Sequence, residues 1–118
     1  MSKKILIIDD EADFGEMVKD LLSEKYTVIT AIDVEQGLKT LEVEMPRLVL
    51  LDILMPKLGG LECLRRIKQM APDTIVVIVS GMQDESVAKE AIRRGAYDYV
   101  TKPFDFARFE KDILSRVF

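Results

Sequence analysis

Short runs of apolar residues alternate with longer amphipathic segments along the chain. The apolar runs lie at 5–8, 27–30, 48–51, 75–79 and, more weakly, 97–100. Such continuous runs, rich in β-branched residues, are typical of strands that are buried on both faces of a parallel sheet. The pattern therefore predicts five strands.

The segments between these runs carry apolar residues at the spacing of one helix face. The five stripes are Phe14, Met17, Val18, Leu21 and Leu22; Val34, Leu38, Leu41 and Met45; Leu61, Leu64, Ile67 and Ala71; Val87, Ala88, Ala91 and Ile92; and Phe106, Phe109, Ile113, Leu114 and Val117. Asp33 with Gln36 resembles a capping box, and Gly95 stands where a helix C-cap is expected. The stripe at 87–92 is short and weakly apolar, so we expect that helix to be held least firmly.

Strands and helices that alternate in this way predict an α/β fold. We expect a five-stranded parallel sheet with five helices on both faces and right-handed crossovers. The length of 118 residues fits one domain, 1–118, with a single core. A hydrophobic fraction of 48% is enough to fill that core.

Composition excludes several classes of protein. The net charge of −4 disfavours direct nucleic-acid binding by this chain. The absence of histidine removes imidazole zinc sites and Ser-His-Asp catalysis. The single cysteine, Cys63, cannot form an internal disulfide, so a reducing cytoplasm is the expected location. No apolar run approaches the ~18 residues that cross a bilayer, so no membrane contact is expected, and the first residues do not resemble a signal peptide.

Polar residues follow or end four of the five expected strands. They are Asp9 and Asp10 after the first strand, Asp52 after the third, Ser80 at the end of the fourth and Lys102 after the fifth. Sites in parallel α/β sheets lie beyond the carboxyl ends of the strands, so we expect these side chains to converge. The three carboxylates exceed the ammonium by two negative charges, which a divalent cation would neutralise. Oxygen-only donors favour Mg²⁺, and a carboxylate beside Mg²⁺ and lysine is suited to attack a phosphoryl donor.

Each of these residues also has an ordinary structural interpretation. Asp10 could cap the following helix, and Asp52 could be a turn residue. Ser80 could make an ordinary hydrogen bond at the end of its strand. Lys102 could be a solvated surface charge, and Tyr99 could belong to the core. None is specific alone, whereas their combination at four strand ends is improbable by chance.

The motifs that carry these residues are ILIIDDE at 5–11, LLDILMP at 50–56 with Gly59 and Gly60 beyond, VSG at 79–81 and GAYDYVTKPF at 95–104. With them, the chain resembles a response-regulator receiver domain of two-component signal transduction over essentially its whole length. The resemblance implies a flavodoxin-like fold with the strand order 2-1-3-4-5.

The resemblance also implies roles. Asp52 would be phosphorylated by a phosphohistidine of a sensor histidine kinase or histidine phosphotransfer protein. Asp9, Asp10, Asp52 and the backbone carbonyl of Leu54 would hold Mg²⁺. Lys102 would pair with the acceptor and then with the phosphoryl group, and its bond to Pro103 would be cis.

Ser80 and Tyr99 match the switching pair of the family. By resemblance, Ser80 moves towards the phosphoryl group and Tyr99 swings inward. The surface made by the helix near 87–92, the strand at 97–100 and the last helix then changes shape, and a homodimer through this surface is expected. Leu54 and Met82 are apolar at the mouth of the site, which predicts a long-lived phosphoryl group.

Other interpretations stay open at this point. An aspartyl-nucleophile phosphatase would need a second Asp where Leu54 stands, and a flavin or nucleotide module would be repelled by the acidic residues at 9–11. A degenerate receiver that acts only as a docking surface conflicts with the complete polar set. We expect a signalling switch that is not an enzyme beyond its own phosphorylation and dephosphorylation, either as a stand-alone relay or as the N-terminal domain of a longer regulator. Gly59 and Gly60 are expected in a flexible loop, and Cys63 is expected to be an inert thiol.

Overall fold

The structure, a computed structural model, describes residues 3–54, 59–81 and 84–118. Its strands are β1 (Lys4–Ile8), β2 (Thr27–Ala31), β3 (Leu48–Leu51), β4 (Ile75–Ser80) and β5 (Asp98–Thr101). Its helices are α1 (Ala12–Leu22), α2 (Val34–Glu44), α3 (Gly59–Met70), α4 (Glu85–Arg93), α5 (Phe106–Phe109), the π-helical stretch η1 (Glu110–Leu114) and α6 (Ser115–Val117). Residues 106–117 form one continuous helical segment, as the last apolar stripe predicts.

All neighbouring strands are parallel, and the sheet order is β2-β1-β3-β4-β5. The predicted α/β fold and its strand order are confirmed. The register pairs Ile8 with Leu51 and Leu51 with Ile78, so β1 and β3 end side by side, and β4 continues for two more residues to Ser80. This register places the residues after Ile8 and Leu51 next to each other at the carboxyl edge.

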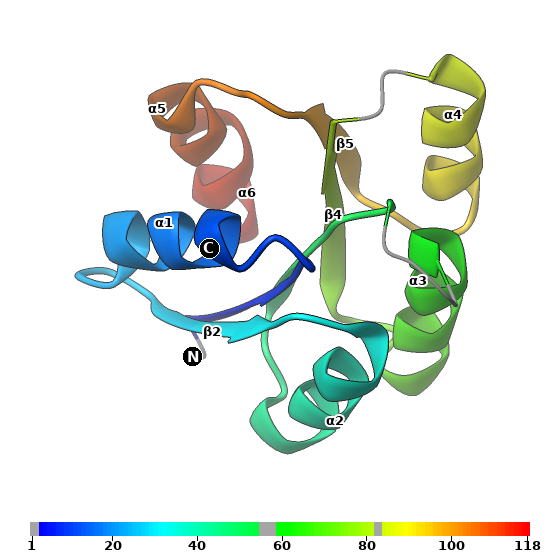
Figure 1. Ribbon diagram of the computed structural model, residues 1–118, viewed down its shortest axis with the longest axis horizontal. Coiled ribbons are helices and arrows are strands. Elements are labelled where there is room, and N and C mark those ends of the chain that lie inside the picture. The colour runs from blue at the N-terminus through cyan, green and yellow to red at the C-terminus, as the bar shows by residue number, and fades with distance from the viewer. Residues whose placement is uncertain (1–2, 55–58, 82–83) are drawn as a thin grey trace.

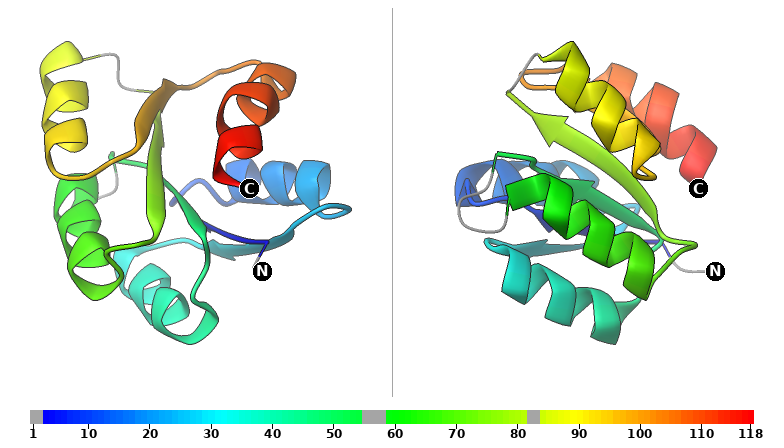
Figure 2. Two further views of the ribbon diagram at one scale, coloured as in Figure 1. Left: turned by 180° about the vertical axis from the view of Figure 1, so that it is seen from behind. Right: turned by 90° about the vertical axis from the view of Figure 1, so that its right-hand side faces the viewer.

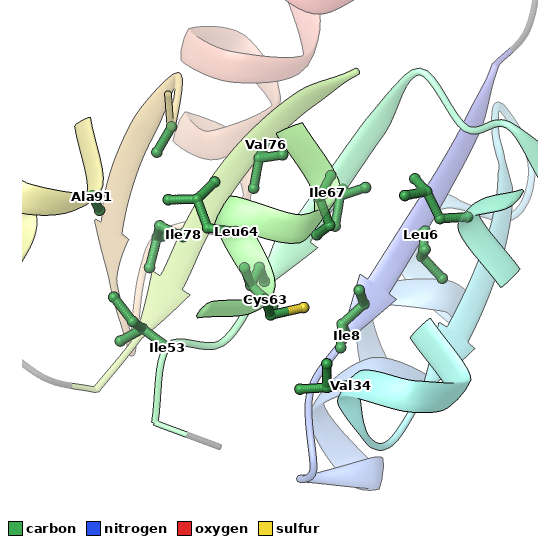
Figure 3. Close-up of a cluster of buried hydrophobic side chains, with 14 of the residues drawn as sticks. Leu6, Ile8, Val34, Ile53, Cys63, Leu64, Ile67, Val76, Ile78 and Ala91 are labelled. Atoms are coloured by element: carbon green, nitrogen blue, oxygen red, sulfur yellow. The ribbon is translucent and has the colours of Figure 1, made fainter. Parts of the chain in front are cut away.

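The helices cover the sheet from both sides (Figure 1). Figure 2 shows α1 and the α5–α6 segment on one face and α2, α3 and α4 on the other. Each face has its own cluster of buried apolar side chains, so the expected single core is two layers divided by the sheet. In Figure 3, Cys63 lies among the apolar residues of the cluster under α2, α3 and α4. Cys63 is fully buried, and burial raises the pKa of its thiol to about 12, which disfavours the reactive thiolate expected to be absent here.

Local sequence signals explain where α2 begins and where α4 ends. The Asp33 carboxylate accepts a hydrogen bond from the Gln36 amide at 2.7 Å, and the Gln36 side chain accepts one from the Ile32 amide at 2.9 Å. The capping box is confirmed, with the reciprocal bond one residue earlier than the standard pattern. Gly95 follows α4 with a φ of +109°, a conformation that glycine tolerates best. Within α4 only Ala91 is fully buried, in keeping with its weak apolar stripe.

Three details of the predicted helices are wrong. Met17 and Leu21 are 49% and 54% exposed, because Gly15, Val18 and Leu22 suffice to cover the sheet and the stripe is wider than the buried face. Met45 is 76% exposed and caps α2 with a positive φ, outside the core. Gly59 and Gly60 do not lie in a loop but form the start of α3.

Candidate functional site

The four polar strand ends meet at the carboxyl edge because backbone pairing continues past the strands. The Asp52 amide donates to the Ile8 carbonyl at 3.0 Å, and the Asp9 amide donates to the Ala31 carbonyl at 3.0 Å. The Lys102 amide donates to the Ser80 carbonyl at 2.8 Å. Asp9, Asp52 and Lys102 are therefore fixed by the sheet itself rather than by flexible loops.

Three carboxylates form one cluster at this edge. One oxygen each of Asp9, Asp10 and Asp52 lies within 4.8 Å of the others. Asp9 and Asp52 are only 3% and 4% exposed, whereas Asp10 faces solvent. Asp10 does not cap α1, because the residue before that helix is Glu11. Convergent carboxylate oxygens, with an open side at Asp10, fit a hard divalent cation that keeps part of its water shell.

The Lys102 ammonium lies inside this cluster. Its Nζ is 2.7 Å from an oxygen of Asp9, 2.9 Å from Glu11 and 3.4 Å from Asp52. Glu11 was missed as a site residue, although its place directly after the two aspartates was a usable signal. The Lys102–Pro103 peptide bond is cis, as the resemblance implied.

Burial and close hydrogen bonds act against each other at this site. Desolvation raises the pKa of Asp9, although hydrogen bonds from Lys102 and from the Glu11 amide oppose this effect. Burial alone would lower the pKa of Lys102, but its bonds to Asp9 and Glu11 outweigh burial and raise that pKa. Asp9, Asp10, Glu11 and Asp52 together exceed the charge of Lys102 by three, which strengthens the predicted need for a cation.

The segment after β3 holds the Asp52 carboxylate in place. The Leu54 amide donates to Asp52 Oδ1 at 2.9 Å, and the Gly60 amide donates to the Ile53 carbonyl at 3.1 Å. A Cβ on Gly60 would lie 2.1 Å from the Ile53 Cα, so α3 can approach this segment only with glycine there. Leu54 is 50% exposed at the mouth of the site. The metal-binding role of its carbonyl stays a prediction, and Met82 lies outside the described residues.

Ser80 and Tyr99 adjoin the site from β4 and β5. Ser80 is fully buried, and Tyr99 is partly buried against the apolar cluster under α2, α3 and α4. Desolvation raises the pKa of Tyr99, while a hydrogen bond to the Ser80 side chain opposes the shift and the Asp52 charge adds to it. Tyr99 is thus a hydrogen-bond partner of Ser80 and lies near enough to Asp52 to feel its charge.

A cleft of about 810 Å³ opens beside the carboxylates, between α1 and the segment that follows β5. Its acidic floor includes Asp10 and Asp52, and its apolar wall consists of Phe14, Met17, Leu21, Leu54, Phe104 and Phe106. The exposed residues Met17 and Leu21 of α1 line this cleft. The apolar side chains of this wall surround the carboxylates of Asp10 and Asp52 at the cleft.

Comparison with known proteins identifies the family to which this chain belongs. The model of the family described as the response regulator receiver domain matches residues 5–114. The chain therefore belongs to the receiver domains of response regulators, the signalling proteins of two-component systems, as the resemblance implied.

Relatives of several lengths carry this domain. The nitrogen assimilation regulatory protein NtrX of Azorhizobium caulinodans is 40% identical over 92% of this chain, which spans only 24% of that relative's length. The chemotaxis protein CheY of Bacillus subtilis is 35% identical over 92% of both chains. The crystal structure of the NtrX receiver domain from Brucella abortus is 40% identical over 96% of both chains, with a TM-score of 0.88. None of the helices in the described parts of the chain has the length and apolar character that crossing a bilayer requires.

Proposed function

We propose that Asp52 accepts a phosphoryl group from a phosphohistidine on a sensor histidine kinase or a histidine phosphotransfer protein. An oxygen of Asp52 forms a bond to phosphorus while the bond from phosphorus to the donor's imidazole nitrogen breaks, and the electron pair leaves with that nitrogen. The observation that carries the proposal is the meeting of Asp52 with Asp9, Asp10 and Lys102 at one sheet edge. Residues 1–118 contain no histidine, so the phosphohistidine would lie outside them.

The carboxylates of Asp9, Asp10 and Asp52, with the Leu54 carbonyl, would hold Mg²⁺. When bound, the ion supplies positive charge against the transferring phosphoryl oxygens. Lys102 provides a second positive charge for those oxygens, and the Ser80 hydroxyl is the nearby donor that would orient one of them. The excess of carboxylates over cations supports this assignment.

The cleft supports the choice of donor. Its apolar wall, with Met17 and Leu21 half exposed, offers a surface for a helix of the donor protein, and its acidic floor contains Asp52. A phosphohistidine carried on an amphipathic helix fits this combination of apolar rim and buried acceptor. Leu54 at the mouth of the site is apolar and offers no polar group to orient an attacking water, which supports a long-lived phosphoryl group.

The test of the acceptor uses intact-protein mass after incubation with Mg²⁺ and acetyl phosphate, a small phosphoryl donor. We expect one phosphoryl group on the wild-type chain and none on Asp52→Asn. Asp73→Asn, an exposed acid before β4 and therefore at the opposite end of the sheet, is the matched control and should be modified like wild type. Modification of Asp52→Asn to the wild-type extent would reject Asp52 as the acceptor.

We further propose that Ser80 and Tyr99 transmit the phosphorylation to the surface formed by α4, β5 and α5. Phosphorylation adds charge and acceptor oxygens at Asp52, which draws the Ser80 hydroxyl away from Tyr99. The hydrogen bond between Ser80 and Tyr99, and the Asp52 charge that raises the pKa of Tyr99, support this coupling. The partner on this surface would be a second copy of the chain.

The switch is tested by self-association in analytical ultracentrifugation with and without beryllium fluoride, which stands in for the phosphoryl group. Tyr99→Ala should still be phosphorylated at Asp52 but should lose the association that the wild type gains. Tyr97→Ala, with an exposed ring before β5, should keep it. Unchanged association of Tyr99→Ala would count against Tyr99 as the relay.

This function is that of a switch, which catalyses only its own phosphorylation and dephosphorylation. Leu54 stands where an aspartyl-nucleophile phosphatase would need an acidic residue, so the phosphatase alternative has less support. The longer relatives carry this domain within larger chains, so both a stand-alone relay and the N-terminal domain of a longer regulator fit the proposal. The acidic net charge supports a chain that does not itself bind nucleic acid.

A further inference from the structure

The Lys102 ammonium has two partners that are not among the proposed cation ligands. One is the Glu11 carboxylate, 2.9 Å from Nζ. The other is the ring of Phe14, whose centroid lies 4.2 Å below Nζ. An ammonium over the face of an aromatic ring is attracted by the ring's negative quadrupole. Both partners lie at the start of α1, outside the triad of Asp9, Asp10 and Asp52.

Lys102 and a divalent cation compete for the same oxygens. The shortest contact of Nζ is to Asp9 Oδ2 at 2.7 Å, and Asp52 Oδ2 lies at 3.4 Å. A divalent cation held by these carboxylates would neutralise their negative charge and repel the ammonium. Lys102 must therefore give up much of its attraction to Asp9 when the cation enters, and yet it must stay near Asp52 to meet a phosphoryl group.

We propose that Glu11 and Phe14 are positioning residues that form a holding site for the Lys102 ammonium. The holding site keeps the ammonium beside Asp52 while Asp9 and Asp52 are released to the divalent cation. The inference rests on the cation of the proposed function. It adds two residues to which the family resemblance assigned no role.

The surroundings of Phe14 suit this task. Its ring meets the edge of the Phe104 ring at a centroid distance of 6.2 Å and an interplanar angle of 70°. Phe104 also packs on Phe109, with centroids 5.0 Å apart, so the aromatic group extends from α1 to α5. The Phe14 face under Lys102 is thus fixed by packing before any cation arrives. The Glu11 carboxylate is 67% exposed and free of packing constraints, so it can follow the ammonium as it moves.

The direct test is the proton NMR spectrum of Lys102. Protons that lie over an aromatic face resonate upfield, so the Lys102 Hε signals should be shifted upfield in the metal-free protein and remain so at saturating Mg²⁺. A return of these signals to their random-coil position on Mg²⁺ addition would overturn the proposal. This spectrum needs no phosphorylation.

Mg²⁺ affinity, measured by calorimetric titration, gives the second test. Phe14→Leu keeps the apolar packing but removes the quadrupole and should weaken Mg²⁺ binding about threefold or more, whereas Phe14→Tyr should stay within about twofold of wild type. Glu11→Gln should weaken binding about threefold or more. Asp13→Asn removes the same charge from an exposed position two residues away and should have a smaller effect.

If Glu11→Gln and Asp13→Asn weakened Mg²⁺ binding equally, the role of Glu11 would be overturned, because the loss of one negative charge anywhere near the site would then explain both effects. Equal affinities of Phe14→Leu and wild type would overturn the role of Phe14. If Phe14→Leu does not fold, the exposed pair Glu11→Gln and Asp13→Asn and the Lys102 spectrum decide the question. Failure of the proposed function is seen separately, as phosphorylation of Asp52→Asn in the mass experiment.

Discussion

Two carboxylates with equally close cations behave in opposite ways in this molecule. Glu62 on α3 lies 2.6 Å from Arg65 Nη2, and its hydrogen bonds to Arg65 lower its pKa to about 2. Asp9 lies 2.7 Å from Lys102 Nζ, and its pKa is nevertheless raised because burial penalises the charged form. The exposed fractions of the side chains, 33% for Glu62 and 2% for Asp9, account for the difference.

The comparison shows that a close ion pair does not by itself satisfy a carboxylate. On the surface of α3, water screens the charges and the arginine completes the pair. At the carboxyl edge, the lost hydration of Asp9 is not fully replaced by Lys102, which is shared among three carboxylates. The edge therefore retains an attraction for a further cation that the surface of α3 does not have.

The largest effect on stability should come from Lys102→Met, which removes the buried ion pair between Lys102 and Asp9. It leaves Asp9 and Asp52 without their ammonium, and the free energy of unfolding without Mg²⁺ should fall by about 3 kcal/mol. Urea unfolding in EDTA measures the change, and Lys102→Arg, which keeps the charge, should lose less. A loss below about 1 kcal/mol for Lys102→Met would contradict this account of the site.

A smaller effect of opposite sign is expected for Asp9→Asn. Removal of a buried charge that the fold disfavours should raise the free energy of unfolding without metal by about 1 kcal/mol. Mg²⁺ should then stabilise the wild type, because it binds the folded state, and should barely stabilise the variant. Thermal unfolding across a Mg²⁺ series measures both effects, with Asp20→Asn as an exposed control. A variant that is less stable than wild type in EDTA would refute the prediction.

The smallest effect is expected for Glu62→Gln, and it depends on pH. The pKa of Glu62 is lowered from 4.5 to about 2 in the folded state, so its contribution to stability is present above pH 4.5 and is lost as the pH falls towards 2. The wild type should be slightly more stable than the variant at pH 6, and the difference should shrink on acidification and in high salt. Thermal unfolding at pH 6 and pH 3 tests this. If the stability difference between wild type and Glu62→Gln were larger at pH 3 than at pH 6, the predicted direction of the pH dependence would be wrong.

Residues next to strands were the easiest to place from the sequence. Asp9, Asp52 and Lys102 were predicted to meet because each directly follows a strand and parallel strands end at one edge. Glu11 and Phe14 could not be assigned in this way. Their relation to Lys102 depends on how the start of α1 lies against the end of β5, about ninety positions further along the chain, and periodicity carries no information on that contact.

The sequence by itself determined the strand and helix order, the parallel sheet and the set of groups at its carboxyl edge, because these follow from local periodicity and from the residues after each apolar run. Only the tertiary structure decided that Met17 and Leu21 line a cleft, that Gly60 packs against the Ile53 backbone, and that Lys102 lies closer to Asp9 than to Asp52. These features depend on distances between separate elements. Packing of whole layers fixes such distances, and no single stretch of sequence records them.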